Sequence, residues 1–296
     1  MNKKHIGTLS LFCMNLIFMT AYISASVSTE AQKLLYAALN ARDLTLLNQA
    51  LSEGANPLAF DEKKGQTPLH NFLEPVPESE RNTAQIIGMV NAILDHLEHQ
   101  QQQSQRINFK ERLLRFLRYR SHVAEPESFS VDVEDVLGRT PLTVALIKGY
   151  RRISELLQER GHANINYQNS AGNTVLHCMI EYFPHALTGK DTITSYKKRL
   201  QFAFERGANI NMQNAQGQTP LMIAVQKYNY PAIDAILNYI PPQKLPQDAH
   251  IPIRNAELRD NNNKTAYDYA HEMAQTFNAQ YLELLKSACN VNPLNW

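Results

Sequence analysis

The sequence predicts an all-α solenoid of about five or six helix–turn–helix units joined by hairpin loops. The first observation is a phrase, Thr-Pro-Leu two residues after a glycine, which occurs three times and once more with valine in place of proline, at residues 65–69, 138–142, 217–221 and 172–176. The second is an asparagine-containing phrase that returns between these copies, at residues 54–56, 163–169 and 207–214. Two phrases that recur in the same order indicate an internal repeat, in which added length adds units to one array.

The chemistry of the first phrase predicts where the helices of each unit begin. Glycine permits the positive φ of a hairpin turn, threonine can cap the next helix, and proline suits a first helical turn because its missing N–H would have no partner there. After Thr140 the apolar positions follow a helical pattern to Leu146, break at Gly149, and resume from Ile153 to Leu157. We therefore expect two short helices in each unit.

The two ends of the array lack the full phrase, as terminal caps do. Residues 34–38 and 44–51 have the apolar pattern of two helices without any Thr-Pro-Leu. At the other end a degenerate phrase at residues 264–267 precedes a second apolar stretch at residues 277–285. We expect these segments to form the first and last helix pairs.

The repeat resembles the ankyrin repeat, whose period is about 33 residues and whose signature contains Thr-Pro-Leu-His. The threonines of the phrase are 73, 34, 45 and 46 residues apart, at positions 67, 140, 174, 219 and 265. Only the interval of 34 is a bare repeat. The first interval equals either two periods or one period with a long insertion, and we favour the insertion because no second signature occurs between Asn71 and Asp135.

The resemblance implies an array over residues 26–290, followed by a short tail at residues 291–296. Within the array it implies a long insertion at about residues 100–134 and shorter insertions at about residues 181–190 and 240–254. The match is weaker where Val175 and Ala266 replace the proline of the phrase.

The composition indicates a large core and no nucleic-acid partner. The chain has 296 residues, of which 44% are hydrophobic, and its formal net charge is +1. A nearly balanced charge argues against nucleic acid. We expect a monomer whose stability comes from packing between neighbouring units.

The first 25 residues have the layout of a cleavable secretory signal peptide. A basic start with Lys3 and Lys4 precedes an apolar run from Leu11 to Ile23, and small residues follow. The alternative is a retained membrane anchor, but an anchor needs about 20 apolar residues and the run is shorter. We expect an exported protein, periplasmic or secreted, similar to the exported ankyrin-repeat proteins of bacteria.

A basic amphipathic helix is predicted at residues 106–122. Phe109, Leu113, Phe116 and Leu117 fall on one helical face, and the basic residues Lys110, Arg112, Arg115 and Arg118 lie around the others. Such helices can bind anionic membranes or partner grooves. The alternative that we favour is that the segment docks on the array by its apolar face, because acidic residues follow it between positions 125 and 135.

No residue pattern predicts catalysis, a metal or a cofactor. His96 and His99 are three residues apart, whereas zinc hydrolases use histidines four apart with a third ligand. In the family that the chain resembles, the histidines at positions 70 and 177 are structural. We therefore expect that the protein is not an enzyme; the remaining alternative is an active site built from the insertions.

The resemblance implies that the chain binds another protein through its hairpin tips and the concave row of first helices. The tips present a mostly neutral, amide-rich strip, which suggests a polar protein partner. The candidate contact residues at these tips are Lys64, Gln66, Arg139, Asn173, Gln216 and Gln218. Peripheral attachment to a membrane through residues 106–122 is the alternative function.

Overall fold

The computed structural model describes residues 29–74, 84–118, 130–182, 190–239 and 255–289, without the side chains at 29, 104–118, 190–191 and 289. The described residues form helices and loops and contain no strand, only an isolated bridge between Asp61 and Gln66. The prediction of an all-α repeat solenoid is therefore confirmed. The chain divides into two compact units, residues 1–129 and 130–296. The expected leader at 1–25, the insertion at 240–254 and the tail at 291–296 lie outside the described residues.

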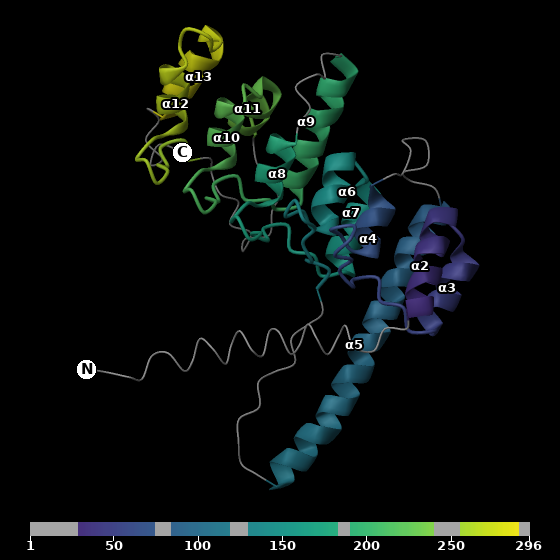
Figure 1. Ribbon diagram of the computed structural model, residues 1–296. Coiled ribbons are helices and arrows are strands. Elements are labelled where there is room, and N and C mark those ends of the chain that lie inside the picture. Colours follow the sequence, from purple (N-terminus) through teal and green to yellow (C-terminus); the bar gives the residue numbers. More distant parts are fainter. Residues whose placement is uncertain (1–28, 75–83, 119–129, 183–189, 240–254, 290–296) are drawn as a thin grey trace. The chain divides into compact units, whose positions relative to one another are not determined.

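The first unit contains four described helices (Figure 1). They are α2 (Thr29–Ala41), α3 (Leu44–Ser52), α4 (Pro68–Leu73) and α5 (Ala84–Arg118). Helix α2 packs against α3 and α4, and α3 packs against α5. Leu35, Leu47, Leu69 and Ile93 are fully buried between these helices. The hydrophobic effect favours removing such aliphatic side chains from water, at about 2 kcal/mol each.

Helix α5 is longer than the sequence pattern indicated. Its first part buries Ile86, Met89, Val90 and Ile93 and packs against α3. The helix then continues without a break through the glutamine-rich stretch to Arg118. The basic segment is therefore part of this helix as far as Arg118, and the remainder of the predicted 106–122 helix lies outside the described residues.

The second unit stacks four helix pairs into a continuous solenoid (Figure 1). They are α6 (Pro141–Lys148) with α7 (Arg151–Glu159), α8 (Val175–Glu181) with α9 (Lys190–Glu205), α10 (Pro220–Gln226) with α11 (Tyr230–Leu237), and α12 (Ala266–Glu272) with α13 (Ala279–Cys289). The first helices α6, α8, α10 and α12 contact one another in succession, as do α9, α11 and α13. Each pair thus buries its apolar face against the next pair.

The threonine of each phrase begins the first helix of its pair. The side-chain oxygens of Thr140, Thr219 and Thr265 accept the backbone N–H three residues further on, at 3.2, 3.3 and 3.2 Å. These bonds satisfy one of the N–H groups that a helix start leaves unpaired. No helix among the described residues is long and apolar enough to cross a membrane.

Candidate functional site: a row of braced hairpin tips

One side chain at the start of each hairpin loop, which we call the bracket residue, holds the loop in place. In the second unit it accepts the N–H groups of the residues two and four positions further on, at 2.8–3.0 Å, and it is Asp135, Asn169, Asn214 or Asp260. In the first unit Asp61 accepts from Lys63 and Lys64 instead, at 3.0 and 3.2 Å. A short Asp or Asn side chain suits this role because it reaches its own backbone two residues on.

Hydrogen bonds also join each tip of the second unit to the next. The side chain of Asn169 donates to the carbonyl of Gly138 at 2.7 Å. Further along, the N–H of Ala215 donates to Ala171 at 3.1 Å, and that of Asn261 donates to Gln216 at 3.1 Å. The successive tips therefore form one bonded row.

The close approach of the tips explains a glycine in two of the loops, whereas the last loop has Asn263, with φ +62°, at the equivalent position. Gly217 has φ +74°, and a Cβ added to it would lie 2.6 Å from the side-chain oxygen of Asn261. At Gly172, also with φ +74°, the added Cβ would lie 2.5 Å from the backbone nitrogen of Ala215. Only glycine allows both the positive φ and the close contact.

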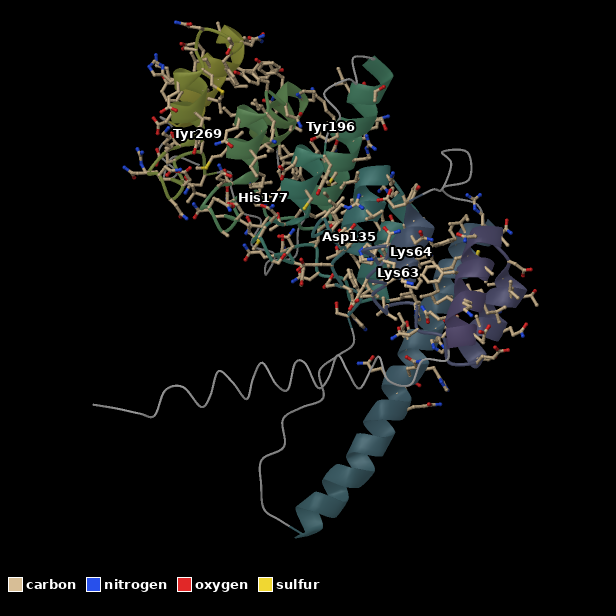
Figure 2. The ribbon with its side chains drawn as sticks, in the orientation of Figure 1. Lys63, Lys64, Asp135, His177, Tyr196 and Tyr269 are labelled. Atoms are coloured by element: carbon tan, nitrogen blue, oxygen red, sulfur yellow. The ribbon has the colours of Figure 1, made fainter. Side chains whose placement is uncertain are left out.

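His177 connects one first helix to the next hairpin (Figure 2). Its Nδ1 accepts the N–H of Thr174 at 3.1 Å, so its Nε2 carries the proton and donates to the carbonyl of Gln218 at 2.9 Å. Burial lowers the pKa of His177 to about 4, and the ring is neutral at pH 7. His70 is also fully buried and lies 2.8 Å from the Thr67 hydroxyl. Both side chains are positioned to brace the fold.

Several predicted contact residues use their polar groups within the array. Arg139 forms an ion pair with the buried carboxylate of Asp135 at 2.7 Å. The side chain of Asn173 accepts from that of Asn214 at 2.9 Å, and Gln218 donates to Gln226 at 3.2 Å. These three predicted residues are half-buried, so less of their polar surface faces solvent than the sequence suggested.

The other predicted tip residues differ in exposure. Gln216 is exposed at its tip. Gln66 is half-buried and donates to the side chain of Asn71 at 3.0 Å. Lys64 is exposed (Figure 2). Its ammonium lies 3.3 Å from the centroid of the Tyr36 ring. The predicted contacts Lys110, Arg112, Arg115 and Arg118 belong to α5, but their side chains lie outside the description.

The structure shows that one tip is apolar, which the prediction of a mostly neutral, amide-rich strip did not indicate. Val136 and Leu137 are 70% and 51% exposed at the hairpin that follows Asp135. The hydroxyl of Tyr182, at the end of α8, donates to the carbonyl of Leu137 at 3.3 Å. A comparison of equivalent loop positions could have found it, because the other tips of this unit have serine, alanine, glutamine or asparagine there.

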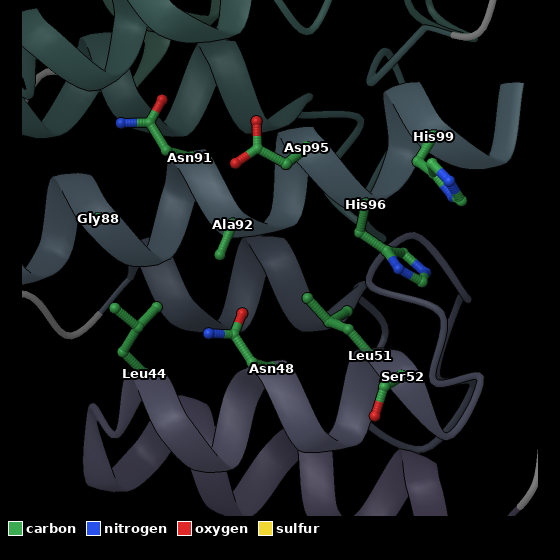
Figure 3. A pocket seen from close by; sticks show the side chains of 10 residues that line it. All are labelled: Leu44, Asn48, Leu51, Ser52, Gly88, Asn91, Ala92, Asp95, His96 and His99. Carbon is green, nitrogen blue, oxygen red and sulfur yellow. The ribbon is translucent and has the colours of Figure 1, made fainter. Parts of the chain in front are cut away.

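His96 and His99 line a groove of about 600 Å³ between α3 and α5 (Figure 3). Leu44, Leu51 and Ala92 also line it. Nε2 of His96 is 2.8 Å from the side-chain nitrogen of Gln100, and burial, followed by the charge of His99, lowers the pKa of His96. Within the described part of the chain no group of three or more His, Cys, Asp or Glu residues is arranged to hold a metal ion.

Two family models match segments of the second unit. The model described as ankyrin repeats (many copies) matches residues 193–237, and the model described as ankyrin repeat matches residues 137–170. Together with the relatives below, these matches confirm the resemblance that the repeated phrases indicated.

Two viral ankyrin repeat proteins are similar to the chain. It is 35% identical over 79 residues to one from Acanthamoeba polyphaga mimivirus, a match that covers 27% of this chain and 16% of that protein. It is 26% identical over 202 residues to one from Fowlpox virus (strain NVSL), covering 64% of this chain and 91% of the relative. The chain therefore matches only a small part of the mimivirus protein.

Among solved structures, the ankyrin repeat domain of Bcl-3, a member of the IkappaB protein family, is similar with a TM-score of 0.52. The sequence identity is 19%, and the match covers 85% of this chain and 81% of that one. At this identity the likeness concerns the fold.

Proposed function

The chain is an ankyrin-repeat protein, and from this premise we propose that it is a non-enzymatic scaffold that binds another protein. Ankyrin repeats form protein–protein interaction modules. In this proposal the partner contacts the hairpin tips and the concave row of first helices. Which partner binds is determined by the side chains that take no part in the packing and hydrogen bonds of the repeat.

The braced row of tips is the observation that supports this proposal most. The bracket residues and the bonds between tips hold the loop backbone, while the side chains after each bracket stay exposed. The exposed tip residues are Glu62, Lys63, Lys64, Val136, Leu137, Ser170, Ala171, Ala215, Gln216, Asn261, Asn262 and Asn263. A preorganised surface binds with a smaller loss of conformational entropy than mobile loops do.

Affinity capture with the full chain tests the tip surface. A tip variant carries Lys64→Ala, Leu137→Ala and Gln216→Ala, and a matched control carries Lys198→Ala and Gln201→Ala on the exposed face of α9. We expect the tip variant to lose most of the protein captured by the parent chain, and the control to retain it, with mass spectrometry as the readout. Equal capture by both variants would contradict recognition through the tips.

Export through residues 1–25 is a second part of the proposal, and the composition of that segment supports it. We expect the exported product to lack about 25 N-terminal residues, since small residues follow the apolar run near that point. Intact-mass measurement of the chain recovered from culture medium and periplasm checks this. Recovery of the chain only inside the cell, with Met1 still present, would overturn it.

Peripheral membrane attachment through residues 106–122 is the alternative function. The favouring observation is that α5 continues as a helix to Arg118, far beyond Leu97, its last buried residue among those described. Co-sedimentation with anionic vesicles should then be lost when Arg112, Arg115 and Arg118 become glutamine. Absence of binding at low salt would eliminate this alternative.

A further inference from the structure

The four hairpin tips of the second unit differ sharply in polarity. Directly after the bracket residue, the first tip has Val136 and Leu137, which are 70% and 51% exposed. The equivalent pairs at the other tips are Ser170–Ala171, Ala215–Gln216 and Asn261–Asn262. The loop backbone is braced in the same way in all four, so the turn does not require aliphatic side chains at this position.

Tyr182, at the end of α8, adds an aromatic side chain to this apolar tip. The residue is 36% exposed, and its ring is held by the hydrogen bond from its hydroxyl to the carbonyl of Leu137. The guanidinium of Arg139 lies 5.6 Å from the centroid of the ring, and Arg139 is itself held by Asp135 through a bond from Nε at 2.8 Å. The aromatic ring is therefore held in position before any partner arrives.

The charges around this tip leave one carboxylate without a cation. Arg139 is paired with Asp135, and Lys227 lies 3.6 Å from Glu181. Glu134 accepts hydrogen bonds from the hydroxyl of Tyr167 and the N–H of Ser170, both at 3.0 Å, and has no ion pair among the described residues. A basic side chain of a partner is the complementary group for Glu134.

The exposed apolar area of the tip distinguishes between two occupants, a second copy of the chain and a single side chain of another protein. A stable dimer buries about 800 Å² per partner, far more than two aliphatic side chains and one half-exposed ring offer. A single large apolar side chain from another protein matches this area, and tyrosine and arginine are enriched where such anchors bind. The surface therefore fits one anchor residue better than a second copy of the chain.

We propose that Val136, Leu137 and Tyr182 form an apolar subsite that binds an extended protein segment with one large aliphatic or aromatic side chain and a neighbouring lysine or arginine facing Glu134. This inference rests on the proposed protein-binding function and specifies the chemistry of its partner. It replaces the polar partner that the amide-rich strip suggested with one anchored by an apolar residue.

A random peptide library displayed on phage and selected against the full chain tests the subsite. We expect the selected peptides to share a Leu, Ile, Met, Phe or Trp next to a Lys or Arg. Fluorescence polarisation with a synthetic peptide of the selected sequence then measures the affinity of variants. Val136→Ser with Leu137→Ala, which copies the Ser170–Ala171 tip of the same chain, should weaken binding at least tenfold.

Two further variants make the result specific. Gln201→Ala, on the exposed face of α9, should leave the affinity unchanged, and Glu134→Gln should weaken binding several-fold and reduce its dependence on salt. Circular dichroism confirms that each variant is folded. Peptides without an apolar anchor, or peptides that bind the Val136→Ser, Leu137→Ala variant as well as the parent, would overturn the subsite while leaving protein binding by the array intact. A library without any binder would also overturn it, and protein capture would still decide the proposed function separately.

Discussion

The two units of the chain use the same hairpin bracket with different spacing. In the second unit every loop from bracket residue to threonine has the same length, and consecutive tips are bonded to each other. In the first unit the loop from Asp61 to Thr67 is one residue longer, and its bracket bonds go to Lys63 and Lys64. Both family models match within the second unit. The difference indicates that exact spacing of the phrase is needed where one tip must meet the next.

Substitution of Gly217 should destabilise the fold more than any other change considered. Gly217→Ala should lower the free energy of unfolding by about 4 kcal/mol, because the new Cβ meets Asn261 and the positive φ is strained as well. Gly207, with φ +92° and nothing within 4 Å of an added Cβ, is the matched control. Gly207→Ala should lower stability by about 1 kcal/mol from strain alone. Urea unfolding measures both, and equal losses would mean that the tips are not in close contact.

Acidification should weaken the second unit through His177. Its pKa is lowered to about 4 from 6.5 by burial, so the unfolded chain binds the proton more tightly than the folded one. The free energy of unfolding is therefore unaffected by His177 above pH 6.5. It falls as the pH drops toward 4, by about 3 kcal/mol in total. Unfolding free energies between pH 7 and 4, compared with those of His177→Gln, check this. The same pH dependence in both proteins would assign the loss to other groups.

The bracket residues should differ in importance between the two units. Asn214 is buried, accepts two N–H groups and also donates to Asn173, so Asn214→Ala should lower stability by about 2 kcal/mol. Asp61 is half-buried, and Asp61→Ala should lower it by about 1 kcal/mol. Thermal and urea unfolding of the two variants give the comparison. A larger loss for Asp61 would contradict the stronger coupling of the second unit.

Substitution of Lys64 should cause the smallest loss of stability. Its ammonium lies over the ring of Tyr36 in the first unit, and such exposed contacts contribute about 0.5 kcal/mol. Lys64→Ala should therefore lower stability by about this amount in urea. Lys63→Ala removes an equally charged, exposed neighbour and should leave stability unchanged. If the two variants behave alike, the ring contact does not stabilise the first unit.

The repeated phrases predicted the fold well because their signals are local. Helices begin directly after the threonines at positions 67, 140, 174, 219 and 265, as the caps indicated. The continuous α5 was not predicted. No glycine or proline occurs from Met89 to Arg118, and the glutamine-rich stretch within it consists of good helix formers.

The candidate site was harder to predict because its contacts join residues far apart in the chain. Asn173 and Gln218 read as exposed amides in the sequence, whereas the structure pairs Asn173 with Asn214, 41 residues away. Tyr182 reaches the carbonyl of Leu137 across 45 residues. Only the stacking of units places such groups together, so the sequence indicated the row of tips but not which side chains remain exposed.

Amide hydrogen exchange of the full chain, alone and saturated with the protein recovered by capture, tests recognition through the hairpin tips. We expect slower exchange in the partner complex at the hairpin segments 134–139 and 168–173, with little change in the second helices. Protection confined to residues 104–118 of α5, with unchanged hairpins, would contradict recognition through the braced tips.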